Sequence, residues 1–321
     1  LELGMFNNAL QFTAEYFVKN SSNLLVGVPL PFSTGAFPAS ITTNAGAMRN
    51  KGFEFSASYN NNNNAFKYSI SANLGTLKNE VLQIGINGNP IYGAASKTIV
   101  GRSAGEIFAY ETAGIFQSAA EIASSPTQTN AGVGDVKFKD INGDGMINDQ
   151  DRTFQGVTIP KYSYGFNFSA TYKNWDLSMF WQGAGGNKVF NSIYRNLMAG
   201  DFGNHHTDML NYWTPTNTNT NVPRPIIGDP NGNGRDSNRF IQDGDYLRLQ
   251  SLEIGYEIPM PTNSVIQKAK VFVNGQNLLT FTKYTGADPD FNSNDGLISR
   301  GYDGGSFPNP RTVSLGVEVN F

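Results

Sequence analysis

Apolar and small polar residues alternate along most of this chain. In the segment 162–172 the even-numbered positions are aromatic residues or Ala, and the odd-numbered positions are Ser, Gly, Asn and Thr. Because successive side chains of a β-strand point to opposite faces, this period of two predicts strands with one apolar and one polar face. The same pattern recurs in the segments 10–18, 53–59, 66–74, 175–181 and 313–321. We therefore predict an all-β fold built from long antiparallel strands.

The alternation slips in the segment 246–258. Apolar residues occupy odd positions up to Leu249 and even positions from Leu252 onwards. One extra residue in a strand shifts the phase in this way. We expect a β-bulge near Gln250 and Ser251, and the face of Arg248 stays undecided at this point.

Two environments suit such strands, a soluble sandwich and a membrane barrel. The alternating segments run to roughly ten residues or more, against about five or six in globular sheets and about nine to eleven for a membrane-spanning strand. Short connections (6–8, 173–174) alternate with long ones, and outer-membrane barrels have short turns on one side and long loops on the other. These features favour an antiparallel transmembrane β-barrel. The long connections are expected at 20–47, 78–160, 188–243 and 280–310.

Composition adds constraints. The 321 residues contain no Cys, 15% charged residues and a net charge of −3. Near-neutral charge argues against a nucleic-acid partner, and the lack of Cys excludes disulfides and thiolate-bound metals. The first residues carry no signal-peptide pattern, and no apolar run of about 18 residues predicts a transmembrane helix. Since the chain starts within a strand pattern, we expect the C-terminal part of a longer protein.

The segment 140–151, DINGDGMINDQD, places oxygen-bearing side chains at alternate positions around Gly145. This spacing is that of an EF-hand loop, and it predicts a structural Ca²⁺ site. Ile147 would attach the loop to the protein. The alternative is an acidic turn without an ion. The candidate ligands are Asp140, Asn142, Asp144, the carbonyl of Met146, Asn148 and Asp151, the last in place of the usual Glu.

Other candidate sites are weaker. The segment 229–236 resembles a cation loop but lacks a final ligand, so we interpret it as a turn. The two histidines, His205 and His206, are adjacent and would point apart. No nucleophile or paired-carboxylate arrangement is evident, so we expect no enzyme activity.

Aromatic and polar side chains supply the remaining candidates. The aromatic candidates for stacking on a substrate are Tyr212, Trp213, Tyr284 and Tyr302, with packing between loops as the alternative role. Polar residues expected on the inner wall of a barrel are Glu54, Asn73, Asn167, Asp176, Gln182, Glu253, Asn274 and Gln276.

Several longer stretches are distinctive in their order along the chain: NAGAMRNKGFEFSASYN, GDVKFKDINGDGMINDQDRTFQG, DGDYLRLQSLEIGYEIP and the last strand, RTVSLGVEVNF. In these stretches the chain resembles the C-terminal barrel portion of SusC/RagA-type TonB-dependent outer-membrane transporters. The resemblance implies a barrel of about twenty-two strands with a plug, in the outer membrane of a Gram-negative bacterium. It also implies import of an oligosaccharide or peptide, energy from TonB through a missing N-terminal part, contact with lipid and a SusD-like surface lipoprotein.

This interpretation divides the chain as follows. Residues 1–321 form one C-terminal barrel segment, 117–160 an extracellular segment with the Ca²⁺-type loop, and 188–243 a long extracellular loop. We expect 105–116 and 135–139 to be β-structure above the membrane. The alternatives are a secreted or surface β-sandwich for binding or adhesion, stabilised by calcium, and a β-rich glycan hydrolase.

Overall fold

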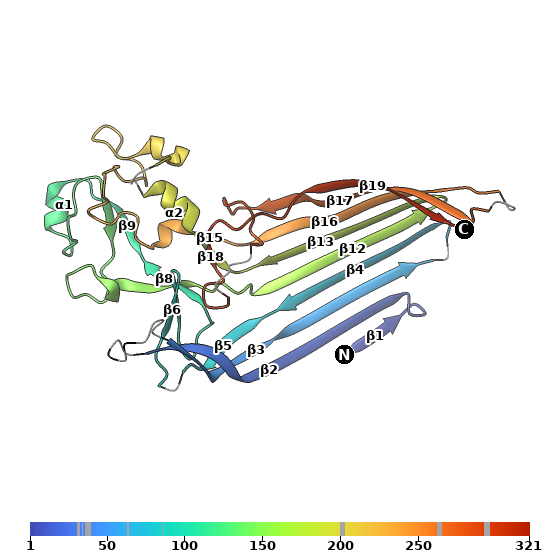
Figure 1. The fold of residues 1–321 in the computed structure, drawn as a ribbon, viewed down its shortest axis with the longest axis horizontal. Helices are drawn as coiled ribbons and strands as arrows, with labels where there is room; N and C mark the ends of the chain where they lie inside the picture. The colour runs from blue at the N-terminus through green and yellow to red at the C-terminus, as the bar shows by residue number, and fades with distance from the viewer. Residues whose placement is uncertain are drawn as a thin grey trace.

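The computed structural model describes residues 1–30, 33, 35, 40–62, 64–85, 87–199, 203–261, 265–291 and 296–321. Within these ranges a ten-stranded antiparallel sheet dominates, in the order β1-β2-β3-β4-β12-β13-β16-β17-β19, with β5 also paired to β3 (Figure 1). The strands are β1 (Glu2–Met5), β2 (Leu10–Pro29), β3 (Ser40–Asn61), β4 (Phe66–Thr76), β5 (Lys78–Gln83), β12 (Tyr162–Tyr172), β13 (Trp175–Gly185), β16 (Tyr246–Ile258), β17 (Lys268–Thr282) and β19 (Thr312–Asn320).

The sheet is a meander whose short connections match the prediction. Strands β12 and β13 are joined by two residues, with Tyr172 opposite Trp175 and Lys173 at φ 54°. A positive φ at a hairpin turn lets the turn follow the twist of the flanking strands. The turn between β1 and β2 likewise has positive φ at Phe6, Asn7 and Asn8. The connection between β16 and β17 includes residues 262–264, which lie outside the described residues.

One face of the sheet exposes large apolar side chains from strand to strand. Soluble monomers rarely expose an apolar surface of this extent, whereas lipid covers such a face in a membrane barrel. In the described ranges the three other sheets have two to four strands, so none of them is the second large sheet that the β-sandwich alternative needs. Exposed members include Tyr16, Phe53, Phe55, Leu74, Phe166, Trp175, Ile254, Val273, Leu315 and Val317.

Aromatic residues border this apolar band at both ends. Tyr172 and Trp175 face each other beside the short turn, and at the other end the rings of Tyr16 and Phe53 lie 4.9 Å apart, near Tyr162. Ten steps from Tyr162 to Tyr172, at about 3.3 Å each, cover roughly 33 Å of strand. With a strand tilt of about 40°, the band is about 25 Å tall, as in outer-membrane barrels.

The predicted bulge is confirmed. Trp181 of β13 pairs with Leu249 and the adjacent Phe180 pairs with Ser251, so Gln250 is an extra residue in β16. On the other side, Leu249 pairs with Leu279 and Ser251 with Gln276, so β17 in turn has one residue more than β16 at this point. The bulge places Arg248 on the polar face, opposite Gln182.

The predicted long loop at 20–47 is wrong. Strand β2 continues to Pro29 and β3 starts at Ser40, with pairs such as Leu25 opposite Asn44. Register shifts between Ser21 and Leu25 break the period of two, which hid the strand in the sequence. Residues 31–32, 34 and 36–39 of this predicted loop lie outside the described residues.

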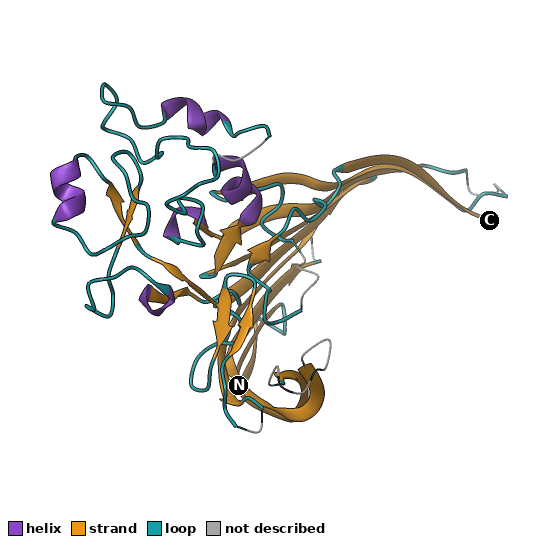
Figure 2. Cartoon of the chain, turned by 60° about the vertical axis from the view of Figure 1, so that its left-hand side comes forward, coloured by secondary structure: helices purple, strands orange, loops and turns teal. Residues whose placement is uncertain are grey.

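Smaller elements gather beyond the end of the sheet opposite the short turns (Figures 1 and 2). We call this part the loop body, comprising the described residues within 84–160, 186–243 and 297–306. Its strands are β6 (Ile91–Gly93), β7 (Ser96–Thr98), β8 (Glu106–Tyr110), β9 (Thr112–Ile115), β10 (Val136–Phe138), β11 (Arg152–Gly156), β14 (Lys188–Asn191), β15 (Ile241–Asp243) and β18 (Tyr302–Asp303). Its helices are α1 (Ala119–Ala123) and α2 (Ser192–Met198), with 3-10 turns η2 (Asp149–Asp151), η3 (Thr207–Asn211) and η4 (Asn238–Phe240).

The β-structure expected at 105–116 and 135–139 is confirmed by β8, β9 and β10. Unlike the sheet, the loop body has an interior of its own, in which Phe190 and Phe240 are fully buried and pack with Ala109 and Met198. No helix in the described ranges has the length and apolar character to cross a membrane.

Candidate functional site

The polar face of the sheet carries the predicted wall residues. The register places Asn73, Gly165, Gln182 and Arg248 in one row across four strands. Alternation then puts the other predicted wall residues on the same face, because they lie an even number of positions away, or across the bulge. This confirms that they share one surface.

Several side chains on this wall form ion pairs and hydrogen bonds with one another. The amino group of Lys270 lies 2.9 Å from Asp176 Oδ2 and 3.0 Å from Glu253 Oε1. Gln182 Nε2 donates to Gln250 Oε1 over 3.1 Å. These wall residues therefore have polar partners within the protein and do not need a ligand to explain them.

A cavity of about 440 Å³ opens on this face where the sheet meets the loop body. Its walls come from β3, β12 and β16, from the segment before β12, and from residues that follow β17. Glu54, Asp290 and Arg300 contribute charge, and Tyr246 and Phe291 contribute aromatic surface. Such a mixed lining can contact both polar and apolar parts of a solute.

Arg248 fastens the segment after β17 to the wall. Its side chain is buried, donates to Thr280 Oγ1 over 3.2 Å and pairs with the carboxylate of Asp288. Asp288 also accepts the backbone N–H groups of Asp290 and Asn309, each at 2.9 Å. Burial raises the pKa of the Asp288 carboxyl, but these N–H donors and the Arg248 guanidinium outweigh burial and lower its pKa below the ordinary value.

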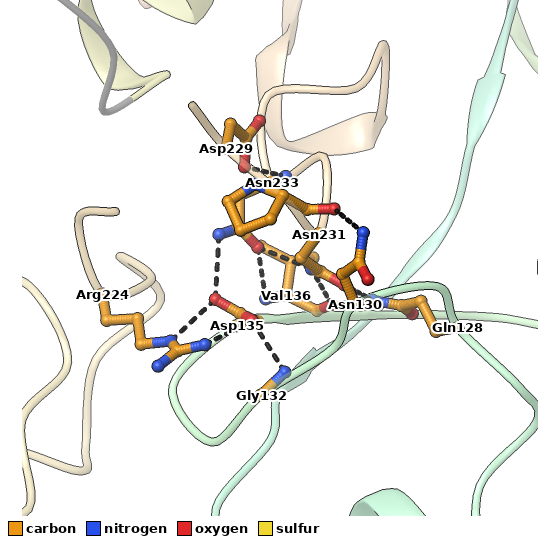
Figure 3. Close-up of polar contacts among 10 residues, drawn as sticks. Gln128, Asn130, Gly132, Asp135, Val136, Arg224, Asp229, Asn231 and Asn233 are labelled. Carbon is orange, nitrogen blue, oxygen red and sulfur yellow. Dashed lines mark hydrogen bonds and ion pairs between the residues drawn. The ribbon is translucent and has the colours of Figure 1, made fainter. Parts of the chain in front are cut away.

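The loop body is held together by a buried polar network around Asp135 (Figure 3). Asp135 is 1% exposed and accepts Arg224 Nε and Nη2, both at 2.9 Å. It also accepts Asn233 Nδ2 at 3.1 Å and the N–H of Gly132 at 2.8 Å. A bidentate arginine with two further donors is the arrangement that compensates a buried carboxylate for lost water.

Amide side chains extend the network to β10. Gln128 Nε2 donates to the Val136 carbonyl at 2.7 Å and to Asn231 Oδ1 at 2.6 Å, and the Val136 N–H donates to Asn233 Oδ1 at 2.8 Å (Figure 3). Asp229 accepts the N–H groups of Asn233 and Gly234. The segment 229–236 is thus a turn docked on 128–136, and the segments 117–160 and 188–243 form one body.

The acidic loop at 140–151 is ordered by its own carboxylates. Asp140 accepts the N–H groups of Gly143 and Gly145 at 2.7 and 2.8 Å. Asp151 is fully buried and accepts the N–H groups of Ile141 and Asn148 at 2.8 and 2.7 Å. These bonds satisfy backbone N–H groups that the tight turn would otherwise leave without an acceptor.

Ile147 attaches the acidic loop to the loop body, as predicted. Its side chain is buried against Tyr110, Val136 and Phe138, and its N–H donates to the carbonyl of Thr127. The loop is therefore anchored without help from flanking helices.

The acidic loop contains the oxygen donors that a hard cation prefers, but the structure brings only some of these donors close together. Asn142 and Asn148 direct their amide groups to Asp144 Oδ2, at 2.9 and 3.4 Å. Hydrogen bonds from Asn142 and the Met146 N–H lower the pKa of Asp144, which therefore stays ionised. In the ranges that the structure describes, no three His, Cys, Asp or Glu side chains are grouped closely enough to hold a metal.

Three of the four aromatic candidates pack within the protein. Trp213 is buried and donates from Nε1 to Gln117 Oε1 at 2.9 Å. Tyr284 is buried with its hydroxyl on Asp303, and Tyr302 stacks on Phe190 with ring centroids 5.7 Å apart. The packing alternative accounts for these three. Tyr212, at 40% exposed, remains accessible to a ligand.

The pairs Asp135–Arg224 and Arg248–Asp288 escaped prediction. Their members are 89 and 40 residues apart, and no local motif marks either pair. Acids and bases that lie far apart in the chain are common in any sequence, so only the contact in the folded structure distinguishes these two pairs.

Comparison with curated proteins gives three informative relatives, although no family profile matches the chain. TonB-dependent receptor P3 of Formosa agariphila is 33% identical over the whole chain, which covers 33% of that receptor. TonB-dependent receptor P26 of the same organism is 32% identical, with 34% of its length covered. TonB-dependent receptor SusC of Bacteroides thetaiotaomicron is 23% identical, with 31% covered. The chain thus spans about a third of the length of these relatives.

Solved structures share the fold. A structure of the RagAB peptide transporter superposes with a TM-score of 0.81 at 22% identity, covering 99% of this chain and 34% of that one. The RagAB importer in its closed-closed state gives 0.79 at 23% identity, covering 100% and 34%. These matches confirm the outer-membrane barrel fold, and the relatives are receptors rather than enzymes, as expected. Along its whole length the chain is similar to a stretch that makes up about a third of TonB-dependent receptors of the Gram-negative outer membrane, SusC among them, and it has the fold of the corresponding part of the RagAB peptide transporter.

Proposed function

We propose that the whole protein imports a large nutrient across the outer membrane with energy delivered through TonB. The observation that carries this proposal is the 33% identity to TonB-dependent receptor P3 along the entire chain. The barrel-type sheet, with its polar inner face and a cavity of about 440 Å³ near the loop body, supports it.

We further propose a SusD-like surface lipoprotein as partner and an oligosaccharide or a peptide as substrate. Similarity to SusC and to the RagAB peptide transporter supports this choice. The loop body offers a rigid platform at one end of the sheet, because the Asp135 network joins its two long segments. Tyr212 is the accessible aromatic candidate for substrate contact.

Uptake assays test the function. Cells with and without the full-length gene would receive fluorescent oligosaccharides and fluorescent peptides of matched mass, each with and without an intact TonB system. We expect uptake of one class to require both the gene and TonB. Uptake of both classes that is unchanged by loss of either would refute the proposal.

We also propose that the acidic loop binds one structural Ca²⁺. The supporting residues are Asp140, Asn142, Asp144, Asn148 and the carbonyl of Met146, which supply the hard oxygen donors that Ca²⁺ prefers. Rotating the two amides would present oxygen in place of nitrogen. Asp151 would close the ligand set from the buried side. Its two N–H bonds leave lone pairs on both oxygens.

Calcium content and loop protection test this second proposal. Purified full-length protein should retain about one more Ca²⁺ than an Asp140→Ala/Asp144→Ala variant, and chelation should expose the loop to protease. Asp229→Asn in the similar-looking turn is the matched control and should leave calcium content unchanged. Equal calcium in wild type and double variant would exclude the site.

A further inference from the structure

A row of lysines lies just beyond the apolar band, on the lipid-facing side of the sheet. The aromatic border there includes Phe53, which pairs with Tyr16 and whose N–H donates to Thr76 Oγ1. Two positions further from the membrane centre, on the same face, Lys51 lies directly opposite Lys78. This is the layer in which lipid headgroups meet a membrane protein.

The lysine pair lacks internal compensation. Like charges directly opposite in a sheet destabilise it. Within the described ranges Lys51, Lys78 and the nearby Lys161 form no ion pair, whereas other lysines, such as Lys188 and Lys268, do.

Two acids close to the lysines in the sheet or in the neighbouring cavity, Glu80 and Glu106, form no ion pair with them. Glu80 shares the strand face of Lys78 but lies opposite Arg49 in the register. Glu106 receives both Nε and Nη2 of Arg102 at 2.8 Å. The three lysines therefore leave a local positive charge that the protein does not neutralise.

The lysines border an open groove of about 670 Å³. Its walls include Tyr16, Phe53 and Leu77 together with Lys51, Lys78 and Lys161. A second cavity, of about 400 Å³, shares Leu77, Lys78 and Lys161 and reaches Arg102 and Glu106. The groove thus combines an apolar wall facing lipid with cations at its headgroup end.

We propose that this groove binds the phosphorylated headgroup of an anionic membrane lipid. Lys51 and Lys78 hold the phosphate, Lys161 lies at the rim, and an acyl chain follows the wall formed by Tyr16 and Phe53. Ammonium groups form short, charge-assisted hydrogen bonds to phosphate oxygens. The bound phosphate also relieves the repulsion between the paired lysines. The site is distinct from the import pathway, which uses the opposite face of the sheet.

Native mass spectrometry of the full-length receptor in dodecyl maltoside tests the site, with diphosphoryl lipid A and its fully dephosphorylated form as probes. Each lysine that contacts the lipid headgroup contributes roughly fivefold to binding of an anionic lipid. We therefore expect Lys51→Ala/Lys78→Ala to weaken diphosphoryl lipid A binding by roughly 25-fold. The dephosphorylated probe should bind both proteins weakly and equally.

Two variants serve as controls. Lys173 lies at the other aromatic border, 5.4 Å from the centre of the Tyr172 ring, so Lys173→Ala removes an interfacial lysine outside the groove and should change binding by less than about twofold. Lys51→Arg/Lys78→Arg keeps the charge and should retain most of the affinity. If the double Ala variant fails to show heat-modifiable migration, the single Lys51→Gln and Lys78→Gln variants replace it, each with a loss of roughly fivefold.

Equal binding of diphosphoryl lipid A by wild type and lysine variants would overturn the proposal. Equal binding of the two lipid forms by wild type would also overturn it, because the phosphate would then be irrelevant. Displacement of the lipid by millimolar inorganic phosphate would assign the lysines to a free anion and refute the lipid site. Uptake can persist in every case, so failure here leaves the proposed import function untouched.

Discussion

The sheet and the loop body bury their apolar residues in opposite ways. In the sheet, Phe53, Phe166 and Val317 lie on an exposed face and polar residues share the other face. In the loop body, Phe190 and Phe240 are 0% exposed and pack in an interior, as in a soluble domain. One chain therefore folds for two solvents, and the boundary falls where the sheet strands give way to the small sheets. The comparison teaches that the same residue type stabilises each region through a different contact, lipid in one and protein in the other.

The largest expected effect separates the two kinds of apolar residue. Phe240→Ala should destabilise the loop body by about 3–5 kcal/mol, because it opens a cavity in a packed interior. Limited proteolysis should then cut the loop body while heat-modifiable migration shows an intact barrel. Phe166→Ala on the lipid face is the matched control and should leave the loop body resistant. If protease cut the loop body equally in both variants, buried and lipid-facing Phe residues would not differ in how they stabilise it.

A charge placed on either face of one strand sharpens the comparison within the sheet. Phe168→Lys puts an ammonium group near the middle of the lipid-facing side of β12 and should cost about 2–4 kcal/mol. Asn167→Lys, its neighbour on the polar face, should cost much less. Urea unfolding in lipid vesicles measures both. A similar loss for the two variants would mean that the faces do not differ in solvent.

The buried network of the loop body should respond to loss of its central acid. Asp135→Ala leaves Arg224 and Asn233 without their acceptor, and we expect a loss of about 2–3 kcal/mol, since the Arg224 side chain is 32% exposed and regains some hydration. Hydrogen exchange of β10 should rise, with no change in the sheet strands. Unchanged exchange would show that hydrophobic packing alone joins the two segments.

The smallest expected effect is a pH dependence at the junction of the two regions. The pKa of Asp288 is lowered in the folded protein, so its contribution to stability is complete above the ordinary carboxyl pKa of about 4 and is lost as pH falls through the lower folded value. Exchange of the Asn309 amide, which donates to Asp288, should rise over that acidic range. In Arg248→Met, exchange of the Asn309 amide should begin to rise at higher pH. An exchange profile identical to that of the wild type would argue against a stabilising Arg248–Asp288 ion pair.

Much of the sheet could be predicted because alternation is a local property. The pattern at 162–172 determines which side chains share a face whatever the partner strand is, and the slip near Gln250 located the bulge. The strand ends at 20–47 could not be predicted, since bulges near Asn23 remove the alternation while the backbone pairing continues. Ile147 was predictable as an anchor because an apolar residue within an acidic loop has few other uses.

For the functional candidates, too, local sequence identified the residues but not their contacts in the folded protein. Trp213, Tyr284 and Tyr302 were chosen by residue type, which cannot distinguish stacking on a ligand from stacking on a neighbouring loop. Burial favours packing for Trp213 and Tyr284, stacking on Phe190 favours packing for Tyr302, and Tyr212 is exposed. The acidic loop kept its motif, but the placement of its carboxylates on N–H donors emerged only in three dimensions.

By itself, the sequence determined most of the strands, their two faces and the resemblance to TonB-dependent receptors, because each depends on neighbouring residues or on the order of motifs along the chain. Only the tertiary structure decided how the long loops unite, that Asp135 meets Arg224 and Arg248 meets Asp288, and that three lysines share one groove. The physical reason is the distance along the chain over which each effect acts. Side-chain alternation acts over two residues, whereas these charges approach only after the strands have brought distant loops to the same end of the sheet.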